Sequence, residues 1–271
     1  MAWAVDNHAS GMAPVTWLAR GDWGPAQVEA ELAAQPFAAS QEVQRLADAD
    51  WDIALIEASR LGRTLFDGPL LRCDEFTVDG ERLRLRLSRT AYRMFWGTNV
   101  RRPDLPDRDR ADPLGTSAVI ETSDGFLVLG RRSPRMALHP NRIHPFGGCV
   151  EPPRGGQPDV FSEIAREIAE ECHLTGCGLR LRALVRDPDL RQPELLFTAT
   201  TPLVRAEVLA RIDPEEHHDS WSCPASQPGV QAALEDPELT PVAAAQLVAW
   251  LGGVGRPGRI AIDYHDRRIP R

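Results

Sequence analysis

The 271-residue chain contains no lysine, and all 31 of its basic residues are arginine. A cationic contact to a phosphate would therefore have to come from arginine, whose planar guanidinium can bind two phosphate oxygens at once. The chain also lacks an apolar run of about 18 residues, the length that crosses a bilayer, so we expect no membrane span. Its net charge of −8 disfavours a broad nucleic-acid surface.

Cysteine is scarce as well. The five cysteines are odd in number and contain no C-x-x-C pair, so we expect reduced thiols rather than disulfides or a zinc site. The N-terminus has no basic segment followed by an apolar stretch, and no secretion signal is predicted. These absences predict a cytoplasmic, globular protein that is long enough for two domains. They leave its oligomeric state open.

What the chain does contain is an acidic helix pattern at residues 166–174, Arg-Glu-Ile-Ala-Glu-Glu-Cys-His-Leu. Glu167, Glu170 and Glu171 fall at i, i+3 and i+4, so a helix would carry the three carboxylates on one side. Like charges at this spacing repel, and a divalent cation would offset the repulsion. Mg²⁺ prefers oxygen ligands and often shares its shell with substrate phosphates. We therefore predict a site for Mg²⁺ or Mn²⁺ here; a solvated acidic helix face is the alternative.

The neighbouring segments favour a phosphate site. Residues 116–132 have the alternation of a β-hairpin with a turn at 123–125. Arg131 and Arg132 follow its second strand, and alternation would aim only one of them into a cleft. Gly147 and Gly148 predict a backbone turn that side chains would obstruct. We take both arginines and both glycines as candidate substrate-binding residues.

These motifs resemble the Nudix hydrolase family, whose box reads G-x5-E-x7-R-E-U-x-E-E-x-G-U, with U aliphatic. Gly148 and the segment 166–171 match it. Three features depart: Arg154 stands where the box has Glu, the following loop has eleven residues instead of seven, and His173 replaces a glycine. Histidine is one of the few residues that tolerate the left-handed conformation which often ends a helix. The resemblance implies a Nudix-type α/β/α sandwich and a metal-dependent pyrophosphohydrolase.

Three further strings are similar to the animal-type Nudix UDP-glucose pyrophosphatase family. They are L-F-D-G-P at 65–69, Y-R-M-F-W-G-T-N at 92–99 and A-D-P-L-G at 111–115. The resemblance covers roughly residues 60–200. It implies hydrolysis of UDP-glucose or UDP-galactose to UMP and hexose 1-phosphate. It also implies that the N-terminal part helps to hold the uridine, through the candidates Phe66, Tyr92, Arg93 and Asn99.

The remaining candidate catalytic residues lie on the acidic helix and downstream of it. Arg166 is expected to orient a carboxylate, because it lies within one helical turn of Glu163 and Glu170. The segment 213–221 resembles the loop that often completes a Nudix metal site, although a solvated acidic loop is the alternative. It and the preceding strand at 194–200 supply four candidates for a base or an extra metal ligand: Glu216, Asp219, His217 and Glu194.

The predicted fold is mixed α/β (α+β), with a smaller N-terminal α/β domain at 1–112 and a Nudix hydrolase domain at 113–271. The N-terminal part is predicted to contain a strand at 15–19, helices at 25–34 and 40–62, a hairpin of 69–78 and 81–88, and an exposed linker at 100–110. The second part is predicted to contain strands at 179–185, 194–200 and 259–264, and helices at 202–212 and 240–251.

Two other functions stay open at this point. The distal half of the box handles only the diphosphate, so another nucleotide substrate such as ADP-ribose would suit it equally. Arg154 in place of the expected Glu also allows a non-catalytic protein that binds a nucleotide sugar.

Overall fold

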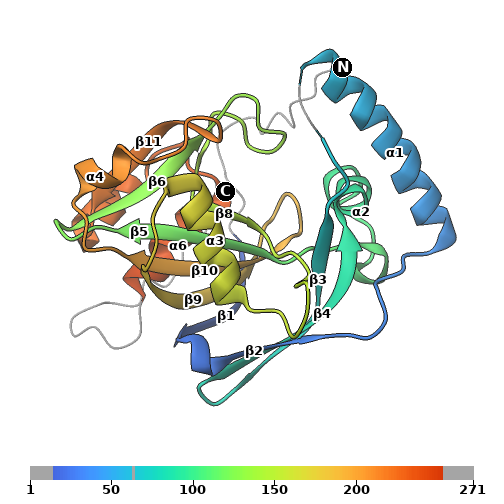
Figure 1. The fold of residues 1–271 in the computed structure, drawn as a ribbon, viewed down its shortest axis with the longest axis horizontal. Coiled ribbons are helices and arrows are strands. Elements are labelled where there is room, and N and C mark those ends of the chain that lie inside the picture. Colours follow the sequence, from blue (N-terminus) through green and yellow to red (C-terminus); the bar gives the residue numbers. More distant parts are fainter. Residues whose placement is uncertain (1–14, 63–64, 253–271) are drawn as a thin grey trace, which may run out of the picture.

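The computed structural model describes residues 15–62 and 65–252, which build two β-sheets with helices around them (Figure 1). The larger sheet has eight strands in the order β1-β9-β10-β5-β6-β11, with β7 paired to β6 and β8 to β5. Its strands are β1 (Thr16–Trp23), β5 (Gly115–Glu121), β6 (Phe126–Arg132), β7 (Ile143–His144), β8 (Phe146–Cys149), β9 (Gly178–Arg186), β10 (Pro193–Thr200) and β11 (His217–Pro224). The mixed α/β class is confirmed.

Helices cover both faces of the larger sheet. On β5, Ala118 and Ile120 enter the core beneath α3 (Val160–Cys172), whereas Val119 between them enters the core beneath α6 (Pro241–Leu251). Alternation along one strand therefore serves two hydrophobic cores. The two helices lie on opposite faces of the sheet (Figure 1), and the predicted sandwich is confirmed. Two shorter helices, α4 (Arg205–Leu209) and α5 (Gln227–Ala233), lie in this part of the chain.

The smaller sheet has the order β2-β4-β3, with β2 (Val28–Leu32) parallel to β4 (Arg82–Ala91) and β3 (Pro69–Asp79) antiparallel to it. The predicted hairpin is confirmed, because the leucines of β4 are buried while its arginines point outward. Arg82 and Arg84 both pair with Glu29 of β2. The pairing explains why this arginine row is a sheet surface rather than a free cationic face.

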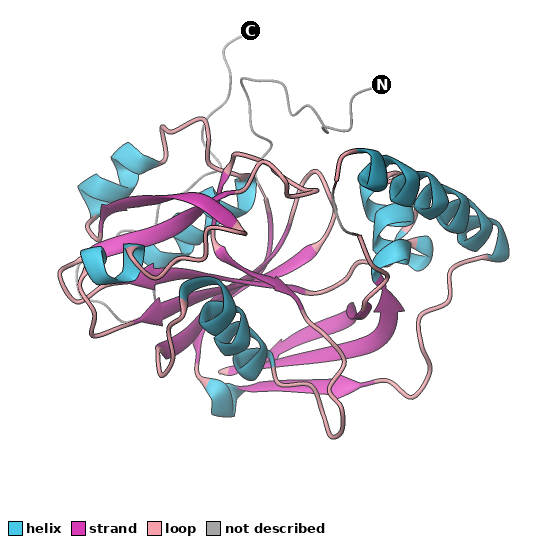
Figure 2. Cartoon of the chain, turned by 45° about the horizontal axis from the view of Figure 1, so that its top comes forward, coloured by secondary structure: helices cyan, strands magenta, loops and turns pink. Residues whose placement is uncertain are grey.

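A long helix, α1 (Gln41–Arg60), lies at the edge of the molecule beside α2 (Tyr92–Phe95) and the π-helical turn Trp96–Val100 (Figure 2). Ser40 caps its first turn by accepting a hydrogen bond from the Val43 amide. Gly97 allows close packing, because a Cβ there would lie 2.4 Å from Cβ of Ala47. The predicted helix at 40–62 is thus confirmed within the described residues.

Several sequence predictions need correction. Residues 25–34 form a 3-10 turn at Pro25–Gln27 and then β2, because the apolar residues from Val28 to Leu32 pair with β4 rather than forming a helical stripe. The predicted Gly-Gly turn is the strand β8, and half of the predicted acidic loop is β11. The helix predicted at 202–212 is the shorter helix α4, which covers only Arg205–Leu209, and α5 was not predicted. The strand predicted at 259–264 lies outside the described residues.

A buried polar network joins the two sheets. Asp112, with φ +33°, accepts hydrogen bonds from Asn99 Nδ2 at 2.8 Å and Arg110 Nε at 2.9 Å. Its other oxygen lies 3.2 Å from a guanidinium nitrogen of Arg186 on β9. The linker predicted at 100–110, which contains the 3-10 turn Asp107–Asp109, is therefore exposed over much of its length but ends in the buried Arg110.

The segment before α3 also reaches the smaller sheet. Gln157, in the loop that is longer than the Nudix box prescribes, accepts a hydrogen bond of 2.8 Å from the backbone N–H of Leu32 on β2. β1 in turn pairs with β9 of the larger sheet, although it precedes the predicted boundary at residue 112. The division into two domains stays a prediction. Among the described residues, no helix is long and apolar enough to cross a membrane.

Candidate active site

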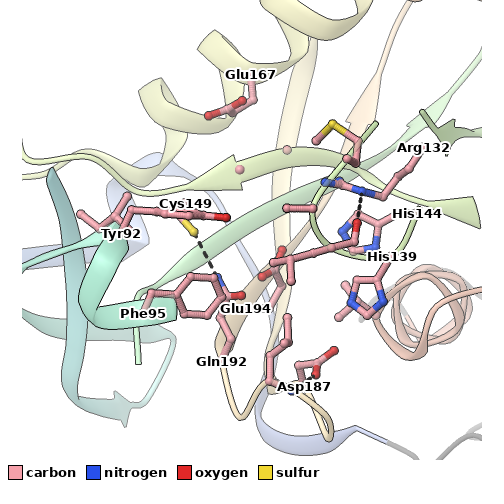
Figure 3. Close-up of a pocket in the computed structure, with 18 of the residues that line it drawn as sticks. Tyr92, Phe95, Arg132, His139, His144, Cys149, Glu167, Asp187, Gln192 and Glu194 are labelled. Atoms are coloured by element: carbon pink, nitrogen blue, oxygen red, sulfur yellow. Dashed lines mark hydrogen bonds between the residues drawn. The ribbon is translucent and has the colours of Figure 1, made fainter. Parts of the chain in front are cut away.

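A cavity of about 330 Å³ opens where the two parts of the chain meet. Figure 3 shows its lining: Glu167 enters from α3, Cys149 from β8 and Glu194 from β10, while Tyr92 and Phe95 come from α2. The Cys149 sulfur accepts a hydrogen bond from the Gln192 amide at 3.2 Å, and burial raises the pKa of its thiol to about 12. This cysteine is therefore a packed thiol rather than a nucleophile.

The two glycines of β8 bring α3 close to the sheet. Gly147 has φ +148°, and a Cβ there would lie 2.0 Å from the Thr116 carbonyl oxygen. Its N–H donates to both carboxylate oxygens of Glu171, at 3.2 and 3.3 Å. A Cβ on Gly148 would lie 2.7 Å from an oxygen of Glu167. The glycines therefore make room for two carboxylates of α3, as strand residues rather than as the predicted turn.

Glu167 and Glu171 line the cavity as buried or nearly buried acids. Burial raises the pKa of Glu171 to about 8, and the charge of Arg132 opposes this shift only in part. Burial likewise raises the pKa of Glu167 to about 8, against the opposing effect of Arg166. Burial makes the ionised form of both carboxylates unfavourable. A cation bound between them would stabilise that form.

Histidine 217 lies behind Glu171, with Nε2 2.8 Å from a carboxylate oxygen. Its Nδ1 has no hydrogen-bond partner among the described residues and packs against Gly130. Burial lowers the pKa of His217 to about 4. A neutral ring with its proton on Nε2 donates to Glu171 and leaves no buried donor unsatisfied.

A candidate metal group can be drawn from Glu171, Glu216 and His217, whose ligand atoms lie within 4.8 Å of one another. Coordination through Nε2 of His217 would move its proton to Nδ1, which faces no acceptor among the described residues. Metal-bound histidines almost always donate that second N–H. The arrangement therefore suits His217 as a residue that orients Glu171, and leaves the carboxylates as the ligands.

Arg166 joins three glutamates along the outer side of α3. Its guanidinium lies 2.6 Å from an oxygen of Glu167 and 2.6 Å from one of Glu170, and it also contacts Glu163. The Glu170 side chain is 58 % exposed and does not line the cavity. The predicted row of three carboxylates thus divides: two members face the cavity and the third faces solvent. His173 ends the helix with φ +51°, in the left-handed conformation that the sequence predicts.

Of the two arginines that end β6, only Arg132 lines the cavity, as strand alternation predicts. Its Nε donates to the Leu138 carbonyl at 3.1 Å. Arg131 points the other way and lies 2.9 Å from Glu238.

The other predicted site residues also fall into two groups, those that line the cavity and those that do not. Phe66, Tyr92, Glu194 and Glu216 line the cavity. Three candidates do not: Arg93 pairs with Asp48 at 3.0 Å, Asn99 is buried in the Asp112 network, and Asp219 is 64 % exposed. Arg154, at the position where the box has Glu, is also exposed and outside the cavity.

Several lining residues were not predicted from the sequence. His139, His144, Asp187, Gln192 and Glu151 all line the cavity but belong to no motif that local pattern identifies. Most come from loops or strand ends that long-range folding brings together. The one local signal was the spacing of two histidines around Pro140 and Asn141, which by itself indicates only a turn.

Comparison with known proteins finds relatives over about half of the chain. No family model matches the chain. The uridine diphosphate glucose pyrophosphatase NUDT22 of Homo sapiens is 32% identical over 55% of this chain and 58% of its own length. The protein of the same name from Mus musculus is 33% identical over 41% of this chain and 46% of its own. Nudix hydrolase 9 of Arabidopsis thaliana is 30% identical over 35% of this chain and 37% of its own.

The chain thus spans only about half the length of the curated relatives it matches. Solved structures with some likeness include a mutT/nudix family protein from Listeria innocua, with 21% identity and a TM-score of 0.40 over 52% of this chain and 92% of that one. The sequence matches and the box at residues 148–174 make the chain similar to Nudix hydrolases.

Proposed function

We propose that the chain is a metal-dependent pyrophosphohydrolase that cleaves the diphosphate of a nucleotide sugar, most directly UDP-glucose or UDP-galactose, into UMP and hexose 1-phosphate. The observation that carries the proposal is the pair Glu167 and Glu171 opposite Arg132 in one cavity. The pair can hold a cation, and the guanidinium can bind phosphate oxygens. The relatives named as uridine diphosphate glucose pyrophosphatases support the choice of base and sugar.

The side chains present fit a hard divalent cation such as Mg²⁺ or Mn²⁺. Glu167 and Glu171 would hold it, with Glu216 at the rim of the same cavity. Glu170 and Asp219, which lie outside the cavity, are not among the ligands that we propose. A bound divalent ion would supply charge neutralisation for the diphosphate and would acidify a coordinated water.

The chain's own residues would position the substrate. Arg132 would bind the diphosphate, and its strand and its hydrogen bond to Leu138 fix its direction. His217 and the Gly147 amide hold Glu171 in one orientation, and Arg166 does the same for Glu167. Such fixed groups contribute to phosphoryl transfer mainly by orientation and by stabilising developing charge.

Two glutamates compete for the role of general base. Glu194 is buried at the start of β10, and burial raises its pKa to about 8. Burial thus disfavours its ionised form, which is the form that accepts a proton. Glu216 lines the cavity beside Glu171 and is exposed to solvent. We propose Glu216 as the base, and His217 as a positioning residue.

Product analysis tests the proposal. With Mg²⁺ present, UDP-glucose should give UMP and glucose 1-phosphate, and ADP-ribose should react much more slowly. Equal turnover of the two substrates would contradict the preference for uridine but would still agree with a hydrolase activity. Thermal stabilisation by UDP-glucose without any product would instead identify a non-catalytic binding protein.

A further inference from the structure

The cavity has two chemically different ends (Figure 3). Tyr92 and Phe95 lie at one end, with ring centroids 5.8 Å apart and ring planes at 70°. His139 and His144 lie at the other end beside Arg132. A nucleotide sugar also has two unlike ends, a flat base and a ring of hydroxyls, and they flank the diphosphate.

The two histidines are held in place by the fold. Their rings stack with centroids 5.8 Å apart and planes at 21°, so each ring covers one face of the other and leaves its edge for hydrogen bonds. The Nδ1 of His144 lies 2.8 Å from the hydroxyl of Thr240, which also caps α6. His139 has φ +51°, a conformation that costs a non-glycine residue energy and recurs at ligand sites.

Both imidazoles are neutral under ordinary conditions. Burial lowers the pKa of His139 to about 4, and burial also lowers the pKa of His144 well below its usual range, with Arg132 adding to each shift. A neutral imidazole offers one donor and one acceptor. Because Nδ1 of His144 is engaged by Thr240, its Nε2 is the atom left for a ligand.

The aromatic end offers different chemistry. Phe66 is 72 % exposed and lines the cavity, and its ring packs on Gly68, whose carbonyl accepts the Tyr92 N–H at 2.9 Å. An exposed aromatic ring at this end of the cavity suits stacking on a flat base. Hydroxyl groups, which donate and accept at once, suit the histidine end instead.

We propose that His139 and His144 form the hexose subsite and that the end with Phe66 and Tyr92 receives the uracil. Arg132 lies beside the histidines, so a phosphate bound to it would place an attached hexose against the two ring edges. This assignment rests on the proposed function, because it divides the cavity between the two halves of its substrate.

The two reaction products separate the two ends. Calorimetric titration in Mg²⁺ would measure the affinity of UMP and of glucose 1-phosphate for the wild type, His144→Ala, His139→Ala and Phe66→Ala. Loss of a hydrogen bond to a sugar hydroxyl should weaken glucose 1-phosphate binding to each histidine variant by about tenfold, and leave UMP binding within a factor of about two. Phe66→Ala should do the reverse.

His144→Gln keeps a polar side chain and serves as the second variant if His144→Ala fails to fold, as judged by its melting temperature. Weaker UMP binding with unchanged glucose 1-phosphate binding in the histidine variants would overturn the assignment. Failure of the wild type to hydrolyse any nucleotide sugar would instead overturn the proposed function, so the two failures are distinguishable.

Discussion

Two buried carboxylates in this protein meet opposite surroundings. Asp112 is 2% exposed and is matched by Arg110, Arg186 and the Asn99 amide. Glu171 is 3% exposed, yet its direct partners are a glycine N–H and the neutral ring of His217. Asp112 thus has cationic partners within the chain, while Glu171 has no direct arginine partner among the described residues.

The difference distinguishes a structural joint, by which we mean the buried network around Asp112, from a candidate binding site. A buried charge with all its partners in the chain stabilises the structure. Removal of one partner leaves the others buried and uncompensated. A buried charge without a cation costs stability and is tolerated where function requires it. Asn99 belongs to a string that resembles a substrate-binding motif, but the structure places its side chain in the joint.

The largest effect that would sharpen this contrast is expected for Glu171→Gln. Turnover of UDP-glucose should fall by about 10³-fold, because the variant loses a charge aimed at the cation and diphosphate. Steady-state kinetics in Mg²⁺ would measure it, and urea unfolding should show no loss of stability. Glu170→Gln, one residue away and solvent-facing, is the matched control and should change turnover less than about threefold. Equal losses in both variants would refute the division of the acidic row.

Asp112→Asn should disrupt the structural joint and destabilise the protein. The variant leaves Arg110 buried beside a neutral amide, and the free energy of unfolding should fall by about 3 kcal/mol. Urea denaturation followed by tryptophan fluorescence would measure it. Asp79→Asn, which disrupts an exposed pair with Arg84, should leave the unfolding curve close to that of the wild type. A wild-type unfolding curve for Asp112→Asn would contradict a structural role for the network.

His217→Ala should weaken the cation site without removing a ligand. Loss of a group that orients a metal-bound carboxylate typically costs about 10–100-fold in metal affinity. Titration of Mn²⁺ followed by electron paramagnetic resonance would measure this affinity directly. His217→Gln can still donate to Glu171 and should recover most of it. Nitrogen coupling from His217 in the spectrum of bound Mn²⁺ would show instead that the ring is a ligand.

A pH-dependent effect on stability is expected for Glu194. Its pKa is about 8 in the folded protein against 4.5 for an unperturbed glutamate, so the folded state binds more protons between these values. The contribution of Glu194 to stability is therefore full below pH 4.5 and is lost as the pH rises to about 8. Glu194→Gln cannot ionise, so its stability relative to the wild type should increase as the pH rises through this range.

Melting curves from pH 4 to 9 in the absence of metal would measure the difference. Glu81→Gln, at an exposed hairpin turn, should follow the wild-type curve throughout. A constant difference between Glu194→Gln and the wild type at all pH values would show that Glu194 does not titrate in this window.

The sequence predicts best what local chemistry determines. The helix with Glu167 and Glu171, the hairpin before Arg132 and the left-handed His173 each depend on residues within a few positions. β2 was mistaken for a helix, because its pairing with β4 lies over fifty residues away, although the alternation from Val28 to Leu32 contained the signal.

The site shows the same limit. Glycine-rich and acidic motifs predicted the carboxylate end of the cavity, since those residues lie on one helix and its partner strand. The histidine end depends on loops that only the complete fold brings together. Asn99 and Arg93 lie outside the cavity lining. A motif identifies a family's residues but does not give the direction of their side chains.

The long loop before α3 has a consequence for solubility. β2 is an edge strand, and an edge strand with free N–H groups invites pairing with a strand from another molecule. Gln157 occupies one such group, the N–H of Leu32. Shortening the loop by the four residues 154–157, to the spacing of the standard box, would uncover that edge, and the foreseeable harm is self-association of the protein rather than damage to its chemistry.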